Sequence, residues 1–293
     1  MTSSPLICDT VLLTTCDMGG KRSGELERLM RSVSAAVADT GLRIRHFLLL
    51  QRCGDNTSVP PLPSHAEVLK IPHRVSLSAA RNMLLKRAIA NGVLNRSRWL
   101  AFPDDDAWYP AGLLKSVDTL FELQPELDIF ICKYASGPHT LATLPAGVGA
   151  AFVPSTRQFV ANVSSNTLMM RTELALSTGY FDERLGIGAP ISGGEDLDFA
   201  LRAYTRGCRK ALLFSAELVG HRDRMVWVRS RYYAGSLFAL CRCSRNAAVA
   251  KEALRKILVG FYLLLRHELT LGEWVSGSRT GLSGWREQTP LVS

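Results

Sequence analysis

Apolar runs of strand length alternate with stretches of helical periodicity over most of the chain. The apolar runs, bounded by polar, Gly and Pro residues, predict strands at 10–16, 43–51, 66–71, 98–103, 127–132, 166–171 and 211–214. Between them, apolar side chains recur every three or four residues, which predicts helices at 26–38, 76–91, 110–123, 172–175 and 195–206. This alternation is typical of βαβ units. We therefore expect an α/β fold with a mostly parallel central sheet flanked by helices.

Two segments lack this alternation. Residues 135–165 are rich in Gly, Pro, Ser and Thr and have weak periodicity, so we expect a long excursion over the ligand site. From residue 229 onward, helix-like stretches carry interleaved aromatic and arginine side chains. These patterns predict a catalytic domain at 1–225 and a basic, mainly helical C-terminal extension at 226–293.

Three consecutive aspartates, Asp104, Asp105 and Asp106, directly follow the strand at 98–103. Ligands of parallel sheets bind beyond the carboxyl ends of the strands, and adjacent carboxylates repel one another unless a cation compensates them. Asp104 and Asp106 leave the strand on the same side, so we predict that they hold Mg²⁺ or Mn²⁺. The alternative is a solvated acidic turn before the helix at 110, which would need one aspartate rather than three.

A second candidate cluster is Gly193-Gly194-Glu195-Asp196, where two glycines precede a helix. The glycines would let a substrate approach the backbone, and a carboxylate in this first turn could act as a general base. The alternative is an ordinary acidic first turn that complements the helix dipole. Arg81, near another helix start, suits a phosphate or an ordinary surface position, and a lone His221 is by itself more typical of a structural residue.

The charge of the chain is concentrated in one segment. The formal net charge is +9, and residues 207–266 carry twelve Lys and Arg against three Asp and Glu. Such a segment indicates an acidic partner, which could be a phospholipid surface, a pyrophosphate or nucleic acid. The seven scattered cysteines fit reduced thiols. No basic segment precedes the first apolar stretch, so we expect no secretory signal and a cytoplasmic location. This location would allow peripheral contact with the inner face of the plasma membrane.

Five segments of the chain, taken together and in order, resemble a known family. They are Ser78-Ala-Ala-Arg81-Asn82, Phe102-Pro-Asp-Asp-Asp106 with Trp108-Tyr-Pro110, Gly179-Tyr-Phe-Asp-Glu183, Gly194-Glu-Asp196 and the late His221. This order and spacing resemble the family 2 glycosyltransferases of GT-A fold, over about residues 8–225. The resemblance implies a Rossmann-like fold and inverting transfer of a sugar from a nucleotide-diphosphate sugar to an acceptor hydroxyl. It implies a metal-dependent enzyme of hexosyltransferase type.

The resemblance also implies roles for particular residues. Asp104 and Asp106 match the DxD motif, and His221 matches a histidine that completes metal binding. Asp196 matches the catalytic base and Glu195 its neighbour at the acceptor. The implied donor-binding residues are Thr14, Thr15, Cys16, Asp55, Arg81, Asp104 and Asp105, and the implied acceptor-binding residues are Gly193, Gly194 and Trp108.

The same resemblance implies a saccharide or lipid-linked saccharide acceptor, in the assembly of bacterial surface polysaccharide or glycolipid. The segment 51–56, which contains Asp55, departs from the acidic motif with which many relatives contact the base, so the resemblance leaves the nucleotide open. For the C-terminal extension, two alternatives remain: an amphipathic element on an anionic membrane, or a core-packing helix pair with a solvated basic face.

Two other functions compete with sugar transfer. A sugar-1-phosphate nucleotidyltransferase would need a Gly-rich signature with Arg or Lys after the first strand, which residues 17–24 resemble loosely. A basic nucleic-acid-binding protein would fit the charge, but the sequence carries no recognised nucleic-acid-binding motif, and we expect no nucleic acid partner.

Overall fold

The centre of the fold is an eight-stranded sheet with the strand order β3-β2-β1-β4-β7-β5-β8-β6. The computed structural model describes residues 6–20, 22–54, 56–137, 141–143, 151–222 and 228–288. Parallel pairing joins β1 to β2 and β4, β2 to β3, and β5 to β8, whereas β7 and β6 run antiparallel to their neighbours. The strands are β1 (Cys8–Asp17), β2 (Ile44–Gln51), β3 (Ala66–Ile71), β4 (Ser97–Ala101), β5 (Leu127–Ala135), β6 (Ala151–Phe152), β7 (Leu168–Arg171) and β8 (Lys210–Gly220).

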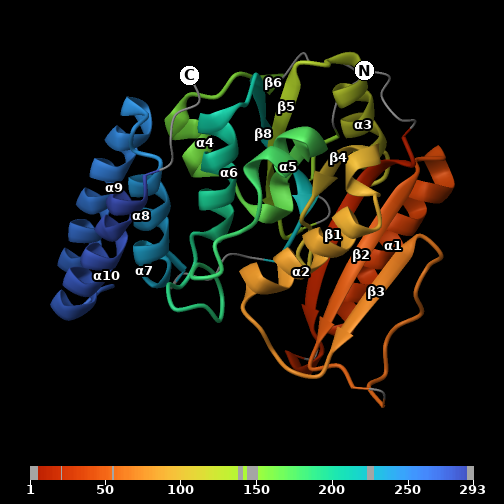
Figure 1. The fold of residues 1–293 in the computed structure, drawn as a ribbon, viewed down its shortest axis with the longest axis horizontal. Helices are drawn as coiled ribbons and strands as arrows, with labels where there is room; N and C mark the ends of the chain where they lie inside the picture. The colour runs from red at the N-terminus through yellow and green to blue at the C-terminus, as the bar shows by residue number, and fades with distance from the viewer. Residues whose placement is uncertain are drawn as a thin grey trace.

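Helices cover both faces of this sheet (Figure 1). Successive side chains of a strand point to opposite faces, so Leu12 packs with α1 and α3 while Val11 and Leu13 pack with the helices of the other face. The helices are α1 (Ser23–Thr40), α2 (Leu77–Ala90), α3 (Leu113–Leu123), α4 (Thr156–Asn162), α5 (Thr172–Thr178), α6 (Glu195–Arg206), α7 (Val228–Arg231), α8 (Tyr233–Arg242), α9 (Ala247–Leu265) and α10 (Leu271–Ser283). The predicted α/β fold with a mostly parallel sheet is confirmed.

The segment 135–165 is more regular than its composition predicts. Where the structure describes it, the segment contains β6 and the helix α4, which its weak periodicity did not reveal, and its last residue, Ser165, contacts Asp196. Helix α4 has seven residues and one buried side chain, Phe159, which is too few to produce a readable periodicity. Its start is fixed by a capping box in which Ser155 and Gln158 satisfy each other's backbone N–H groups.

The C-terminal helices pack into the same core as the sheet. Tyr233 and Leu237 of α8 belong to the apolar cluster that also contains strand residues of β1, β2 and β4. Arg242 of α8 reaches the buried Asp198 of α6, with Nη1 3.2 Å from Oδ1. The predicted domain boundary at 225/226 falls outside the described residues, and on either side of it the two predicted parts share one hydrophobic core.

Among the residues that the structure describes, none of the helices combines the length and apolar character that a membrane crossing needs. All seven cysteines are free thiols, and six of them are buried.

Candidate functional site

The acidic triple lies at the carboxyl edge of the sheet and meets His221 there. The carboxylate and imidazole ligand atoms of Asp104, Asp106 and His221 all lie within 4.8 Å of one another. His221 Nε2 is 2.9 Å from Asp106 Oδ1 and 3.5 Å from Asp104 Oδ2. Strand β8 is longer than the sequence predicts, and its extension to Gly220 delivers His221 to this edge. The structure thus brings together the three residues predicted to bind a metal.

The donor set fits a divalent cation. Asp106 is 1% exposed, and neither of its carboxylate oxygens accepts a hydrogen bond of regular geometry, although Arg222 Nε lies 2.7 Å from Oδ2. Burial lowers the pKa of His221, but the adjacent carboxylates of Asp104 and Asp106 outweigh this effect and raise the pKa to about 10. The carboxylates of Asp104 and Asp106 therefore stabilise a positive charge placed between them. Two carboxylates with an imidazole are ligands that Mn²⁺ and Mg²⁺ accept.

Asp105 is not part of this cluster. Its carboxylate pairs with the guanidinium of Arg22 in the loop after β1 and lies beside the thiol of Cys16. Burial raises the pKa of Asp105 to about 6, while the charge of Arg22 opposes this rise. The residue therefore fastens the loop after β1 to the end of β4, and its predicted contact with a donor stays a prediction.

Arg81 joins the acidic triple to the first turn of α6. Its side chain is 2% exposed, with Nη1 2.5 Å from Asp196 Oδ1 and Nη2 3.2 Å from Asp104 Oδ1. Asp196 Oδ2 also accepts a hydrogen bond from the backbone N–H of Ser165, at 3.0 Å. Residues from α2, from the segment after β4 and from α6 thus form one connected polar group.

Helix α2 is held in this position by the segments that resemble the family motifs. The side chain of Asn82 makes two hydrogen bonds to the backbone of Phe181, at 2.8 and 2.9 Å. Ser78 Oγ donates to the carbonyl of Leu185 at 2.6 Å. The segment 181–185 leads directly to the turn before α6, so these bonds fix Arg81 relative to Asp196.

Glu195 lies beside Asp196 and is buried. Burial and the neighbouring Asp196 raise the pKa of Glu195 to about 7, although the charge of Arg81 opposes the shift. Its carboxyl carbon lies 3.2 Å from the position that a Cβ on Gly186 would occupy. Two carboxylates with different environments therefore stand at the start of α6, one paired with an arginine and one held in a less polar place.

The structure shows that glycine is needed at positions 193 and 194 for a reason other than the approach of a substrate. Both have positive φ, at 72° and 83°, and a Cβ on Gly194 would lie 2.3 Å from the carbonyl carbon of Gly235 in α8. A Cβ on Gly193 would meet the ring of Tyr232 at 2.4 Å. The glycines are required because α8 packs directly on this turn, and their predicted contact with an acceptor stays a prediction.

The remaining predicted residues lie on the β1 and β4 side of the site. Thr14 donates to the carbonyl of Pro103 at 3.0 Å and accepts from His46 Nε2 at 2.9 Å, while Thr15 and Cys16 follow it along β1. Asp55 lies outside the described residues.

Trp108 supports β8. Its backbone pairs with Gly220 through two hydrogen bonds of 2.9 Å, and a Cβ on Gly220 would fall 1.8 Å from its ring. The guanidinium of Arg28 lies 4.0 Å from the ring centroid. Trp108 therefore holds the strand that carries His221, and its predicted role at an acceptor stays a prediction.

Three residues of the site were not found from the sequence. Arg22, Arg222 and Ser165 contact Asp105, Asp106 and Asp196, respectively. Arg222 follows His221 directly, so this adjacency was the available signal for it. Arg22 and Ser165 come from segments without periodicity, and only the pairing of distant chain segments reveals their contacts.

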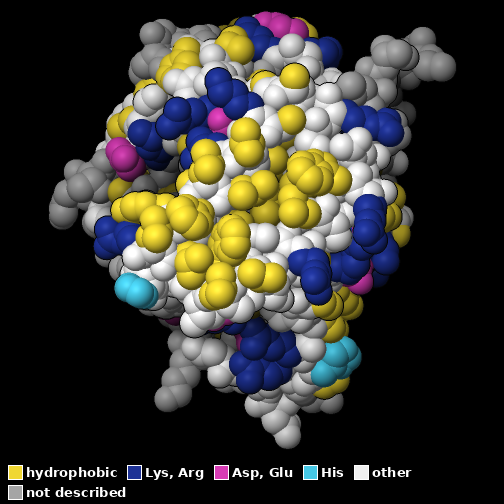
Figure 2. Space-filling model, turned by 90° about the vertical axis from the view of Figure 1, so that its left-hand side faces the viewer, with side chains coloured by type: hydrophobic (Ala, Val, Ile, Leu, Met, Phe, Trp, Pro, Cys, Tyr) yellow, Lys and Arg dark blue, Asp and Glu magenta, His cyan; other side chains and the backbone are white. Residues whose placement is uncertain are grey.

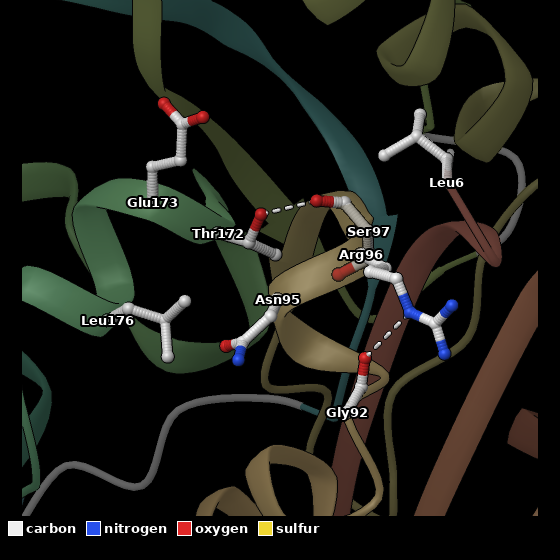
Figure 3. Close-up of a pocket in the computed structure, with 8 residues that line it drawn as sticks. All are labelled: Leu6, Gly92, Asn95, Arg96, Ser97, Thr172, Glu173 and Leu176. Carbon is white, nitrogen blue, oxygen red and sulfur yellow. Dashed lines mark hydrogen bonds between the residues drawn. The ribbon is translucent and has the colours of Figure 1, made fainter. Parts of the chain in front are cut away.

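A pocket lies at the opposite edge of the sheet, where β4 begins (Figure 3). It is lined by residues such as Asn95, Ser97 and Glu173, and Thr172 donates a hydrogen bond to the carbonyl of Ser97. Because ligands of such sheets bind beyond the carboxyl ends of the strands, this pocket is not the candidate site.

No protein-family model matches the chain, and no curated protein matches it significantly. Solved structures do. S. aureus TarS superposes with a TM-score of 0.65 at 12% identity, over 94% of this chain and 49% of TarS. This chain therefore shares the fold of TarS. It spans about half the length of TarS.

The shorter TarS 1–349 superposes with a TM-score of 0.56 at 12% identity, over 95% of this chain and 91% of that one. Its complex with UDP-GlcNAc gives a TM-score of 0.55 at 12% identity, over 95% and 92%. Identity this low establishes the fold alone, and the narrower assignment to family 2 stays a prediction.

Proposed function

We propose that the protein is an inverting, metal-dependent glycosyltransferase that moves a sugar from a nucleotide-diphosphate sugar to an acceptor hydroxyl. The observation that carries this proposal is the connected group formed by Asp104, Asp106, His221, Arg81 and Asp196 at the carboxyl edge of the sheet. A cation site and a candidate base lie side by side there, as a displacement at a sugar carbon requires. The solved complex of TarS 1–349 with UDP-GlcNAc, on the same fold, supports a nucleotide-sugar donor.

In this proposal each residue has a defined task. Asp104, Asp106 and His221 would hold Mn²⁺ or Mg²⁺, which when bound supplies positive charge to a leaving diphosphate. Arg81 fixes the carboxylate of Asp196 through their ion pair. Asp196 accepts the proton of the acceptor hydroxyl as the acceptor oxygen attacks the sugar carbon opposite the diphosphate, and a single displacement of this kind inverts the configuration.

Arg22 and Arg222 add positive charge beside the same carboxylates. Arg22 Nη2 lies 3.7 Å and Arg222 Nε 2.7 Å from Asp106 Oδ2, and the side chain of Arg222 is 51% exposed. An exposed guanidinium next to the cation site suits a diphosphate. We propose a saccharide or lipid-linked saccharide as the acceptor, in surface polysaccharide or glycolipid assembly, and a cytoplasmic location.

The test is a thermal-shift and turnover panel of UDP-, GDP- and dTDP-sugars, each with and without Mn²⁺. We expect one nucleotide class to raise the melting temperature with Mn²⁺ and to release nucleoside diphosphate when an acceptor is added. In parallel, UTP with a sugar 1-phosphate tests the nucleotidyltransferase alternative through release of pyrophosphate. Stabilisation by none of the nucleotide sugars, or pyrophosphate release alone, contradicts the proposal.

A further inference from the structure

Helix α9 exposes an apolar stripe on the side that faces away from the core. Leu254, Leu258, Phe261, Tyr262 and Leu265 follow the spacing of one helix face, and they are between 48% and 63% exposed. The opposite face of α9 supplies the buried residues Val249, Ala253 and Leu263. The outer side of an ordinary surface helix is polar. Helix α9 differs, because apolar side chains lie on its exposed side as well as on its buried side.

The stripe continues onto the neighbouring helix α10. Leu271 and Val275, one helical turn apart, are 62% and 46% exposed. We call these seven side chains the apolar face: Leu254, Leu258, Phe261, Tyr262, Leu265, Leu271 and Val275. Figure 2 shows hydrophobic side chains gathered in one broad area on this side of the molecule. Contiguous exposed patches of this kind mark interaction surfaces rather than ordinary scatter.

The charge around the apolar face is positive. Figure 2 shows Lys and Arg side chains around the hydrophobic area, with few carboxylates among them. Residues 247–288 carry six Lys and Arg and four Glu. The four carboxylates are engaged locally: Glu252 with Arg255, Glu268 with Arg266, Glu273 in the cap at Thr270, and Glu287 with Arg184. Arg255 and Arg266 are themselves paired in this way, so residues 247–288 keep a net charge of +2, and Lys251 and Arg279 of this rim are exposed.

We infer that the apolar face docks on an anionic lipid surface, with its leucines and aromatic side chains in the interface and its basic rim over the headgroups. A basic rim complements anionic headgroups, and burial of the apolar side chains adds to the binding. A second copy of the chain fits less well, because a twofold interface would place the same positive rim against itself. Tyr262 accepts a hydrogen bond from Arg266 at 3.2 Å, the amphipathic arrangement that favours a membrane–water boundary.

The position of the face suits the candidate site. Helix α8 lies between α6, which begins with Glu195 and Asp196, and the pair α9 and α10, so one helix layer separates the docked helices from the start of α6 (Figure 1). The carboxyl edge of the sheet is at the bottom of that view and the α9–α10 side at its left. Docking would leave the site open along the plane of the membrane rather than cover it.

The test is flotation of the full chain with vesicles of phosphatidylcholine alone, or of phosphatidylcholine and phosphatidylglycerol in equal parts. We expect binding to the anionic vesicles, weakening with salt. Leu258→Asp with Phe261→Asp should reduce it at least about tenfold. Lys251→Glu with Arg279→Glu should weaken binding to the anionic vesicles by about fivefold or more for each of the two cations removed. The matched control is Leu123→Asp with Val153→Asp, which changes two side chains of similar exposure, 73% and 67%, away from this face and should bind normally.

Circular dichroism melts confirm that each variant is folded, and the readout needs no nucleotide sugar, so a failure here leaves the proposed transfer reaction untouched. Three results would overturn the inference: no binding to anionic vesicles, equal binding by the wild type and the Leu258→Asp, Phe261→Asp variant, or equal binding to neutral vesicles. A dimer in light scattering that the same variant abolishes, without vesicle binding, would assign the face to a second copy instead.

Discussion

Arg81 and Asp196 form an ion pair that ties the acidic triple to the first turn of α6. Arg81 Nη1 lies 2.5 Å from Asp196 Oδ1, and its other terminal nitrogen lies 3.2 Å from Asp104 Oδ1. One buried guanidinium thus neutralises carboxylates from two parts of the chain that are about ninety residues apart. The proposed cation site and the proposed base share this arginine. A change of charge at one of them should therefore alter the position of Arg81 and its ion pair with the other.

Replacing Arg81 should cost both stability and activity. Arg81→Gln removes the cation that two carboxylates share, and we expect the free energy of unfolding to fall by about 2 kcal/mol. The loss is smaller than for a fully buried pair because Asp104 and Asp196 are 32% and 24% exposed. Arg87→Gln on the same helix, where the exposed guanidinium pairs with Glu67, is the control and should change stability by less than about 1 kcal/mol. Equal denaturant midpoints for the two variants would contradict this account.

The two carboxylates of α6 can be distinguished by kinetics. Asp196→Asn should lower kcat by about 10²–10⁴-fold, because it removes the proposed proton acceptor. Glu195→Gln should mainly raise KM for the acceptor, since in the proposal Glu195 neighbours the acceptor without taking its proton. The measurement is initial-rate kinetics on folded variants with the donor identified by the panel. The reverse order of losses would make Glu195, whose pKa is raised to about 7, the base.

Neighbouring aspartates should respond differently to metal. We expect Mn²⁺ to raise the melting temperature of the wild type and to lose this effect in Asp106→Asn. Asp105→Asn is the matched control, because its carboxylate faces Arg22 rather than the Asp104–Asp106–His221 cluster. This variant should still respond to Mn²⁺. Loss of the Mn²⁺ response in both variants alike would argue against the separate role of Asp105.

The buried His46 should make the protein sensitive to acid. Burial lowers the pKa of His46 from 6.5 to about 3, and its Nε2–H is held by Thr14. At pH 7 the imidazole of His46 is mostly neutral in both the folded and the unfolded protein. Below pH 6.5 it becomes protonated in the unfolded chain but stays neutral in the folded protein. The resulting stability loss accumulates down to about pH 3 and reaches about 2 kcal/mol at pH 5.

Denaturant unfolding at pH 7 and pH 5 measures this loss. His46→Gln should reduce the difference between the two pH values by about 2 kcal/mol. The control is His73→Gln, which replaces an exposed imidazole and should leave the difference unchanged. An identical pH dependence in the wild type and His46→Gln would show that other groups account for the acid sensitivity.

The contact between α8 and the turn before α6 can be tested at a glycine. A Cβ on Gly235 would lie 2.1 Å from the carbonyl oxygen of Gly193, so Gly235→Ala should destabilise the protein by about 1–3 kcal/mol. It should also lower activity, because the turn carries Glu195 and Asp196. Gly272→Ala in α10 has open space around its Cβ and should be neutral or stabilising by up to about 1 kcal/mol. Thermal melts of both variants decide the matter.

The sequence predicted what depends on local pattern. The strand before Asp104 and the helix after Gly194 were readable because their apolar residues follow simple periods, and their ends placed two carboxylate groups at one edge of the sheet. The partners of these groups were not readable. Arg22 and Ser165 reach the site from segments without periodicity, and the close approach of Gly235 to Gly193 is set by tertiary packing. Helix α9 packs one face into the core and leaves the other face apolar and exposed, and its contact with a membrane stays a proposal.

The position of β7 makes assembly of the sheet depend on a segment that follows both of its neighbouring strands, β4 and β5, in the chain. Strand β7 lies between β4 and β5, and these two strands precede it in the chain by about 70 and 40 residues. Until Leu168–Arg171 has been synthesised, β4 and β5 each present an unpaired edge, and neither half of the sheet can join the other. Folding should therefore be slow and should pass through states that are prone to edge-to-edge association, and a fragment ending before residue 168 should aggregate rather than form a smaller version of the domain.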